Sequence, residues 1–112
     1  MTLTDDERVE IRKDFREVVN MSPSDLEDWL ATEESQSVGD TGGDGESTGH
    51  ASGRRIIEIK RSNVDELTDE DHEHMRKVVG YVHRHLAQAP DRDVRDTAWR
   101  YSLMNWGHDP LA

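Results

Sequence analysis

The chain has 112 residues, which is enough for one hydrophobic core and short for two domains. The absence of cysteine excludes a disulfide framework or a thiolate metal site, and it fits a reducing compartment. No apolar stretch approaches the roughly 18 residues of a membrane-spanning helix, and the first residues lack the basic and apolar regions of a signal peptide. We therefore expect one soluble domain, residues 1–112, in the cytoplasm and without a membrane partner.

Acidic residues dominate the composition. Asp and Glu number 25 against 14 Lys and Arg, so the formal net charge is −11, and only three of the basic residues are lysines. An acidic, lysine-poor surface indicates a halophilic protein, because molar salt shortens the Debye length to about 3 Å and screens the repulsion between carboxylates. The alternative is an ordinary acidic protein.

The charge is distributed unevenly along the chain. Residues 1–49 contain 4 basic and 14 acidic side chains, whereas residues 74–108 contain 6 basic and 3 acidic ones. A basic stretch in an otherwise acidic chain indicates a surface where positive charge has been retained. An anionic partner is therefore expected at the C-terminal half.

Two helices are predicted before residue 35. Thr4 and Glu7 have the spacing of a capping box at the start of a helix over residues 5–19. Ser22 can cap a second helix, with Pro23 in its first turn, that extends to about residue 34. Both starts are local signals, because a cap satisfies backbone N–H groups that the helix itself leaves unpaired.

The segment over residues 35–53 is predicted to be a flexible loop or an insertion. It contains six of the eight glycines together with Ser, Asp and Thr, and it has almost no apolar residues. Glycine-rich loops can hold a phosphate group, but this one lacks the P-loop spacing, and its carboxylates would repel an anion. A plain linker is the simpler interpretation.

The second half is predicted to be helical as well. Residues 54–61 suit a short helix or, as second choice, a strand, because their three isoleucines fit either period. A capping signal at Thr68 precedes the most regular helix, residues 69–88. Gly80 lies inside that helix, which predicts that a neighbouring helix packs closely there. The predicted fold is therefore all-α, with about five helices in one small domain.

The last predicted helix, over residues 98–106, is rich in aromatic residues. Thr97 can cap it and Gly107 can end it. We expect its rings to complete the core, with Trp106 buried against the long helix. The alternative is a stacking platform for nucleic-acid bases, which would require exposed rings. The aromatic residues concerned are Trp99, Tyr101 and Trp106.

Four stretches of the chain resemble a known family. They are residues 20–30, residues 49–59, the sequence HMRKVVGYVHRHLAQ at residues 74–88 and the sequence WRYSLMNWGHDP at residues 99–110. These stretches are similar to the uncharacterised microbial family called domain of unknown function 3140, and they cover nearly the whole chain after the first helix. The resemblance implies no catalytic residue. Some members are labelled DNA-binding, which implies a nucleic-acid partner.

Enzymatic chemistry is not expected from the residues. The chain has no cysteine nucleophile and no Gly-x-Ser-x-Gly elbow. Four histidines lie on the helix over residues 69–88, but those that share a face are about 16 Å apart, too far to share a metal ion. We expect polar-face or capping histidines, no catalytic residue, no cofactor and no metal site. A metal-dependent enzyme is the remote alternative.

Basic residues carry the functional hypothesis. Phosphate recognition needs cations, and the guanidinium group suits it best. We expect a non-enzymatic helical module that binds DNA or RNA mainly through phosphate contacts. The alternatives are that these cations pair with the abundant carboxylates, and that the acidic half serves a protein–protein adaptor or a stress-associated structural protein. The candidate nucleic-acid-binding residues are Arg54, Arg55, Lys60, Arg61, Arg76, Lys77 and Arg84.

The charge balance generates a prediction about folding. Removing salt should expand or unfold the protein, because the carboxylates crowded into residues 1–49 would then repel one another without screening. Circular dichroism across a potassium chloride titration measures this as a loss of helicity at low salt. Helicity that is constant down to low salt would contradict the halophilic interpretation.

Overall fold

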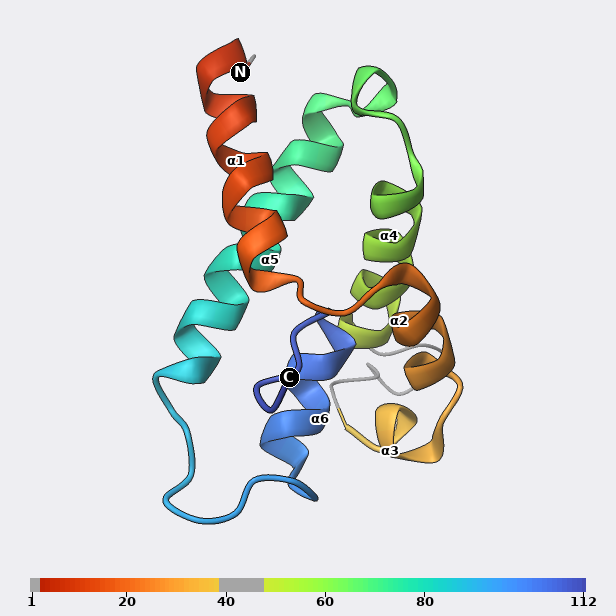
Figure 1. Ribbon diagram of the computed structural model, residues 1–112, viewed down its shortest axis with the longest axis vertical. Helices are drawn as coiled ribbons and strands as arrows, with labels where there is room; N and C mark the ends of the chain where they lie inside the picture. The colour runs from red at the N-terminus through yellow and green to blue at the C-terminus, as the bar shows by residue number, and fades with distance from the viewer. Residues whose placement is uncertain (1–2, 39–47) are drawn as a thin grey trace.

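The computed structural model of the protein describes residues 3–38 and 48–112. This part of the chain forms α-helices and one 3-10 helix, and no strand occurs in it. In chain order the elements are α1 (Asp5–Val18), α2 (Pro23–Leu30), α3 (Glu33–Gln36), α4 (Thr48–Arg61), η1 (Val64–Glu66), α5 (Asp69–Leu86) and α6 (Ala98–Asn105). The prediction of an all-α fold is confirmed (Figure 1).

The helices begin where the capping signals predicted. The Thr4 hydroxyl accepts a hydrogen bond from the Glu7 amide at 3.1 Å, and the Glu7 carboxylate accepts one from the Thr4 amide at 3.1 Å. Thr68 and Asp71 form the same reciprocal box at the start of α5. Ser22 caps α2, with Pro23 in the first turn. Local backbone chemistry therefore sets these boundaries.

The second predicted helix is interrupted at Thr32. Its backbone is extended, with φ −82° and ψ 158°, and its hydroxyl accepts from the Ser35 amide at 3.1 Å. Threonine offers the backbone a local alternative to helical hydrogen bonds, so α2 ends and the short α3 begins there. The prediction of one continuous helix to residue 34 is therefore wrong.

The predicted loop over residues 35–53 is shorter at both ends. Ser35 belongs to α3 and is fully buried, and α4 already begins at Thr48. Residues 39–47 lie outside the described part of the chain. The prediction of a helix rather than a strand over residues 54–61 is confirmed, as the second half of a longer helix.

The helices form two groups around a shared core. Figure 1 shows α1 lying along α5, while α2, α4 and α6 gather on the other side, and both α4 and α6 also contact α5. The most deeply buried apolar side chains come from both groups: Leu26, Ile56, Met75, Val78, Val82 and Leu103. Among the described helices, none combines the length and the apolar composition that crossing a bilayer requires.

Gly53 lies where α4 packs tightly against α6 and α2. A Cβ atom at this position would lie 2.6 Å from the Asn105 backbone oxygen on α6 and 2.9 Å from the Leu30 side chain on α2. Gly49, one turn earlier, would place a Cβ 3.2 Å from the Trp106 indole nitrogen. The glycines that suggested flexibility therefore form a bare helix face against which α6 packs.

Gly80 has the opposite environment. A Cβ atom there would meet only the guanidinium of Arg84, at 3.1 Å, and no other helix lies within 4 Å. The prediction that a neighbouring helix packs on Gly80 is therefore wrong. The residue lies on the outer surface of α5.

The two glycines should respond oppositely to the same substitution. Gly80→Ala should raise the free energy of unfolding by about 0.5–1 kcal/mol, because alanine favours the helix and the flexible Arg84 tip can move aside. Gly53→Ala should lower it by about 1–3 kcal/mol, because the added methyl meets α6 backbone. Urea denaturation of both variants provides the measurement. Equal effects would contradict the assignment of Gly53 to a helix crossing.

Candidate basic surfaces and a basic pocket

The predicted basic residues of α4 are engaged with the protein itself. Arg55 pairs with Asp71 at 3.3 Å, and Arg61 pairs with Glu27 at 3.1 Å. The Lys60 ammonium donates to the Val19 and Met21 carbonyls at 3.4 and 3.2 Å. Arg54 is exposed and likewise takes part in an interaction. These cations therefore lie on different sides of α4.

The predicted basic residues of α5 are more exposed. Arg76 approaches Glu73 at 3.5 Å and Glu7 at 3.8 Å. Lys77 and Arg84 are both exposed, and the described residues offer neither of them an ion pair or a hydrogen bond. Positions 77, 80 and 84 share one side of a helix, so these two cations flank Gly80 on the outer surface of α5.

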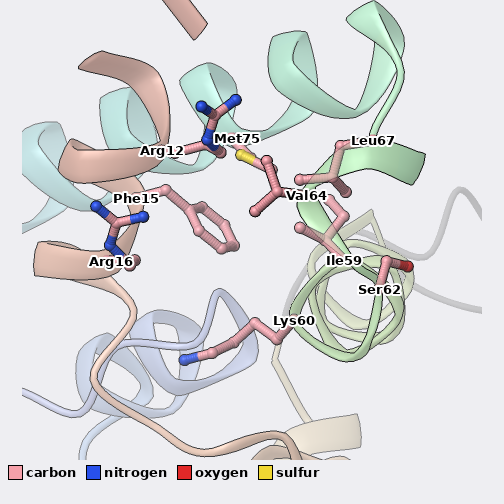
Figure 2. A pocket seen from close by; sticks show the side chains of 9 residues that line it. All are labelled: Arg12, Phe15, Arg16, Ile59, Lys60, Ser62, Val64, Leu67 and Met75. Carbon is pink, nitrogen blue, oxygen red and sulfur yellow. The ribbon is translucent and has the colours of Figure 1, made fainter. Parts of the chain in front are cut away.

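A pocket of about 170 Å³ opens between α1, the end of α4 and the start of α5. Phe15, Ile59 and Met75 form its buried apolar floor, and the exposed Val64 lies at its rim. The complete lining is Arg12, Phe15, Arg16, Ile59, Lys60, Ser62, Val64, Leu67 and Met75. Figure 2 shows the three cations projecting from α1 and α4 around the Phe15 ring. We call this site the basic pocket.

Two cations of the basic pocket are held by neutral acceptors. The His72 Nδ1 atom lies 2.7 Å from the Thr68 carbonyl oxygen, which can only accept, so Nδ1 carries the proton. The His72 Nε2 atom then accepts from the Arg12 guanidinium at 2.9 Å. Lys60 is held by the carbonyls at the end of α1, and burial lowers its pKa. Neither cation is neutralised by a carboxylate in these contacts.

Sequence reasoning identified Lys60 but missed Arg12 and Arg16. The overall acidity of residues 1–49 concealed them. Arg8, Arg12 and Arg16 recur every four residues, which places them along one side of α1 next to the buried Phe15. That spacing was a signal available in the sequence.

Two of the three aromatic residues predicted to complete the core do so, Trp99 and Trp106, whereas Tyr101 lies outside the core cluster with its ring 5.4 Å from that of Trp29. Trp106 is 5 % exposed and stacks on Tyr81, with ring centroids 4.2 Å apart. The stack continues to His74 at 6.4 Å on one side, and through Tyr81 to His85 at 5.2 Å on the other. Trp99 stacks on His85 at 6.1 Å and donates from its indole nitrogen to the His85 carbonyl oxygen. Burial of Trp106 against the long helix is confirmed.

Two histidines of α5, His72 and His74, lie in less polar surroundings than the sequence predicted. His72 is 1 % exposed and lies between α1 and α5, and His74 contacts the buried Ser52 hydroxyl at 2.9 Å. The interpretation as polar-face histidines is therefore wrong for these two residues. His108 does bond the Val18 carbonyl near the end of α1, at 2.6 Å, as a capping side chain would. Within the described residues, no three His, Asp or Glu side chains come together as a metal site.

The buried imidazole of His74 makes stability depend on pH. Burial lowers the pKa of His74 from 6.5 to about 4, and the positive charges of Arg55 and Lys77 act in the same direction. Burial also lowers the pKa of His85. An unfolded chain takes up these protons near pH 6.5 while the folded chain stays neutral. Stability is therefore full above pH 6.5 and declines as the pH falls toward 4.

The free energy of unfolding should fall by roughly 2 kcal/mol between pH 7 and pH 5 on account of His74. This range lies above the titration of ordinary carboxylates, whose pKa is about 4. His74→Phe keeps a ring beside Trp106 and should flatten the dependence, as urea denaturation at both pH values would show. His83→Phe, at an exposed position on the same helix, provides the control. An unchanged pH dependence in His74→Phe would contradict the assignment.

Comparison with known proteins agrees with the resemblance seen in the sequence. Residues 14–104 match the family model described as protein of unknown function DUF3140. Searches of curated proteins and of solved structures return no match. The matched residues run from within α1 to within α6, and they include most of the basic pocket and the aromatic stack. The chain therefore belongs to the DUF3140 family.

Proposed function

We propose that the protein is a non-enzymatic, cytoplasmic module that binds nucleic acid through the outer surface of α5. The observation that carries this proposal is the pair of exposed cations, Lys77 and Arg84, which flank Gly80 and have no carboxylate partner among the described residues. The proposal is narrower than the seven-residue site expected from the sequence, because Arg55 and Arg61 pair with carboxylates and Lys60 lies half-buried in the basic pocket, away from α5.

The charge of α5 supports this choice of surface. From residue 74 to residue 90 the chain contains Arg76, Lys77 and Arg84 but no Asp or Glu. The Arg84 guanidinium lies over Gly80, so a phosphate group that approached α5 at this point would meet that guanidinium directly. Arg76 can contribute less than these two cations, because it also lies beside Glu7, Glu10 and Asp14, whose carboxylates repel a phosphate group.

The expected binding is weak and insensitive to base sequence. Phosphate contacts position a nucleic acid without reading its bases, and none of the three cations lies beside an exposed aromatic ring. Each neutralised phosphate contributes about 0.9 to the slope of log affinity against log salt for duplex DNA. Two or three contacts therefore predict a slope of about 2 to 3.

The proposal can be tested by titrating mixed-sequence duplex DNA and single-stranded RNA at several salt concentrations. Fluorescence anisotropy should show binding at the lowest salt that keeps the protein folded. Lys77→Glu/Arg84→Glu should abolish that binding, and Lys77→Glu alone should reduce the salt slope by about 1. Circular dichroism of each variant establishes that it remains folded.

Lys13→Glu is the matched control. Lys13 is also an exposed lysine on a helix, but it lies on α1. The substitution changes the net charge by the same amount as Lys77→Glu and should leave binding almost unchanged. If Lys13→Glu weakens binding as much as Lys77→Glu does, only net charge matters and the proposed surface is wrong. Absence of binding to either polymer would refute the proposal altogether.

A further inference from the structure

The basic pocket is unusual for this chain because its lining contains three cations and no carboxylate. Asp and Glu outnumber Lys and Arg by 25 to 14 over the whole sequence, so a surface drawn at random would be acidic. Two other hollows contain both signs of charge: Arg54 and Arg61 share one with Glu27 and Glu58, and Arg76 shares another with Glu7, Glu10 and Asp14. The three cations of the basic pocket therefore share its lining with no carboxylate.

The floor of the basic pocket is apolar and firmly packed. Phe15, Ile59 and Met75 are exposed by only 4 %, 6 % and 1 %, and each belongs to a different helix. Val64, 54 % exposed, stands at the rim in η1, and Leu67 lies half-buried beside it. An apolar group that entered here would cover surface that water now contacts.

The three cations retain donors that the protein does not use. The structure gives Arg12 one hydrogen bond, to His72, although a guanidinium has five N–H donors. Lys60 uses two of its three N–H groups, on the Val19 and Met21 carbonyls. Arg16 is exposed and has no hydrogen bond or ion pair among the described residues.

The positions of Arg12 and Lys60 are set before any ligand arrives. The His72 ring is fixed by the hydrogen bond that its Nδ1 donates to the Thr68 carbonyl, and the ring in turn fixes the Arg12 guanidinium. The carbonyls at the end of α1 fix the Lys60 ammonium. Burial also costs Lys60 part of its hydration, so an approaching anion would regain attraction that water no longer supplies. Positioned cations lose little conformational entropy when they bind.

We propose that the basic pocket binds a small organic anion, a carboxylate attached to an apolar body of about one six-membered ring. A dry cavity of about 150 Å³ holds benzene in another protein, so about 170 Å³ accommodates a body of this size. The apolar body packs against Phe15, Ile59 and Leu67, and the carboxylate stays at the rim, where Arg16 is free to meet it. This site is separate from the nucleic-acid surface proposed on α5.

Benzoate is a suitable probe because it combines both features. Its titration into the folded protein, followed by ¹H–¹⁵N NMR, should give saturable shifts at the backbone amides of Arg16, Ser62, Val64 and Leu67. A ligand of this size is expected to have a Kd of about 1 mM. Benzyl alcohol keeps the ring without the charge, and acetate keeps the charge without the ring. Both should bind at least about fivefold more weakly.

Arg16→Gln tests the role of the charge at an exposed position that the fold does not need. It should weaken benzoate binding by about five- to tenfold, the effect of one charge-assisted contact, and leave benzyl alcohol unaffected. Arg92→Gln removes another exposed arginine outside the pocket and should change neither affinity. The proposal is overturned if benzoate causes no saturable shifts at these amides up to about 50 mM, if acetate binds as well as benzoate, or if Arg16→Gln binds benzoate normally.

Discussion

The crossing of α4 and α6 at Gly53 and Asn105 is the contact on which the C-terminal half depends. The Asn105 side-chain oxygen accepts from the Trp29 indole at 2.8 Å and from the Ser35 hydroxyl, and its amide donates to the Ser35 carbonyl at 3.1 Å. Its backbone meanwhile lies directly against Gly53. One fully buried residue thus links α2, α3, α4 and α6, and leaving any of these groups unpaired would cost about 1–3 kcal/mol.

The pairing of α1 with α5 depends on polar contacts at its edge as well as on apolar packing. Arg8 makes two hydrogen bonds with Asp69, at 3.0 and 2.7 Å, and Arg12 bonds the buried His72 one turn further on. The contact with Asp69 places the Arg8 guanidinium beside the acidic first turn of α5, where the Asp69 carboxylate neutralises its charge. The second contact does not neutralise anything, because His72 is held as a neutral acceptor by Thr68. Neighbouring arginines on one helix therefore differ in how much positive charge they leave available.

Local chemistry made part of this structure predictable from the sequence. The capping boxes at Thr4 and Thr68 involve residues three positions apart, so the sequence contains the whole interaction. Gly49 and Gly53 could not be assigned this way, because the groups they pack against, the Trp106 side chain and the Asn105 backbone, lie about fifty residues away. The candidate binding site was harder to predict than the helices. The sequence shows that Arg55 and Arg61 are basic, but tertiary packing decides that Asp71 and Glu27 are their partners. The four-residue spacing of Arg12 and Arg16 was visible, and only the excess of acid around it obscured it.

Binding at the α5 surface and binding in the basic pocket should depend differently on salt. Lys77 and Arg84 are exposed, so ions screen them fully, and at molar salt a Debye length of about 3 Å leaves them little reach toward a phosphate. Arg16, which meets the carboxylate of the ligand, is exposed as well, but the apolar body packed on Phe15, Ile59 and Leu67 would hold that carboxylate in direct contact with it, where few ions can intervene. Salt also does not weaken the burial of an apolar group against the floor of the basic pocket, and strongly hydrated salts strengthen such burial. At molar salt the basic pocket would therefore keep its affinity, whereas the α5 surface would need a high local concentration of nucleic acid. The two proposals thus make different demands on salt, and affinities measured across one salt series distinguish them.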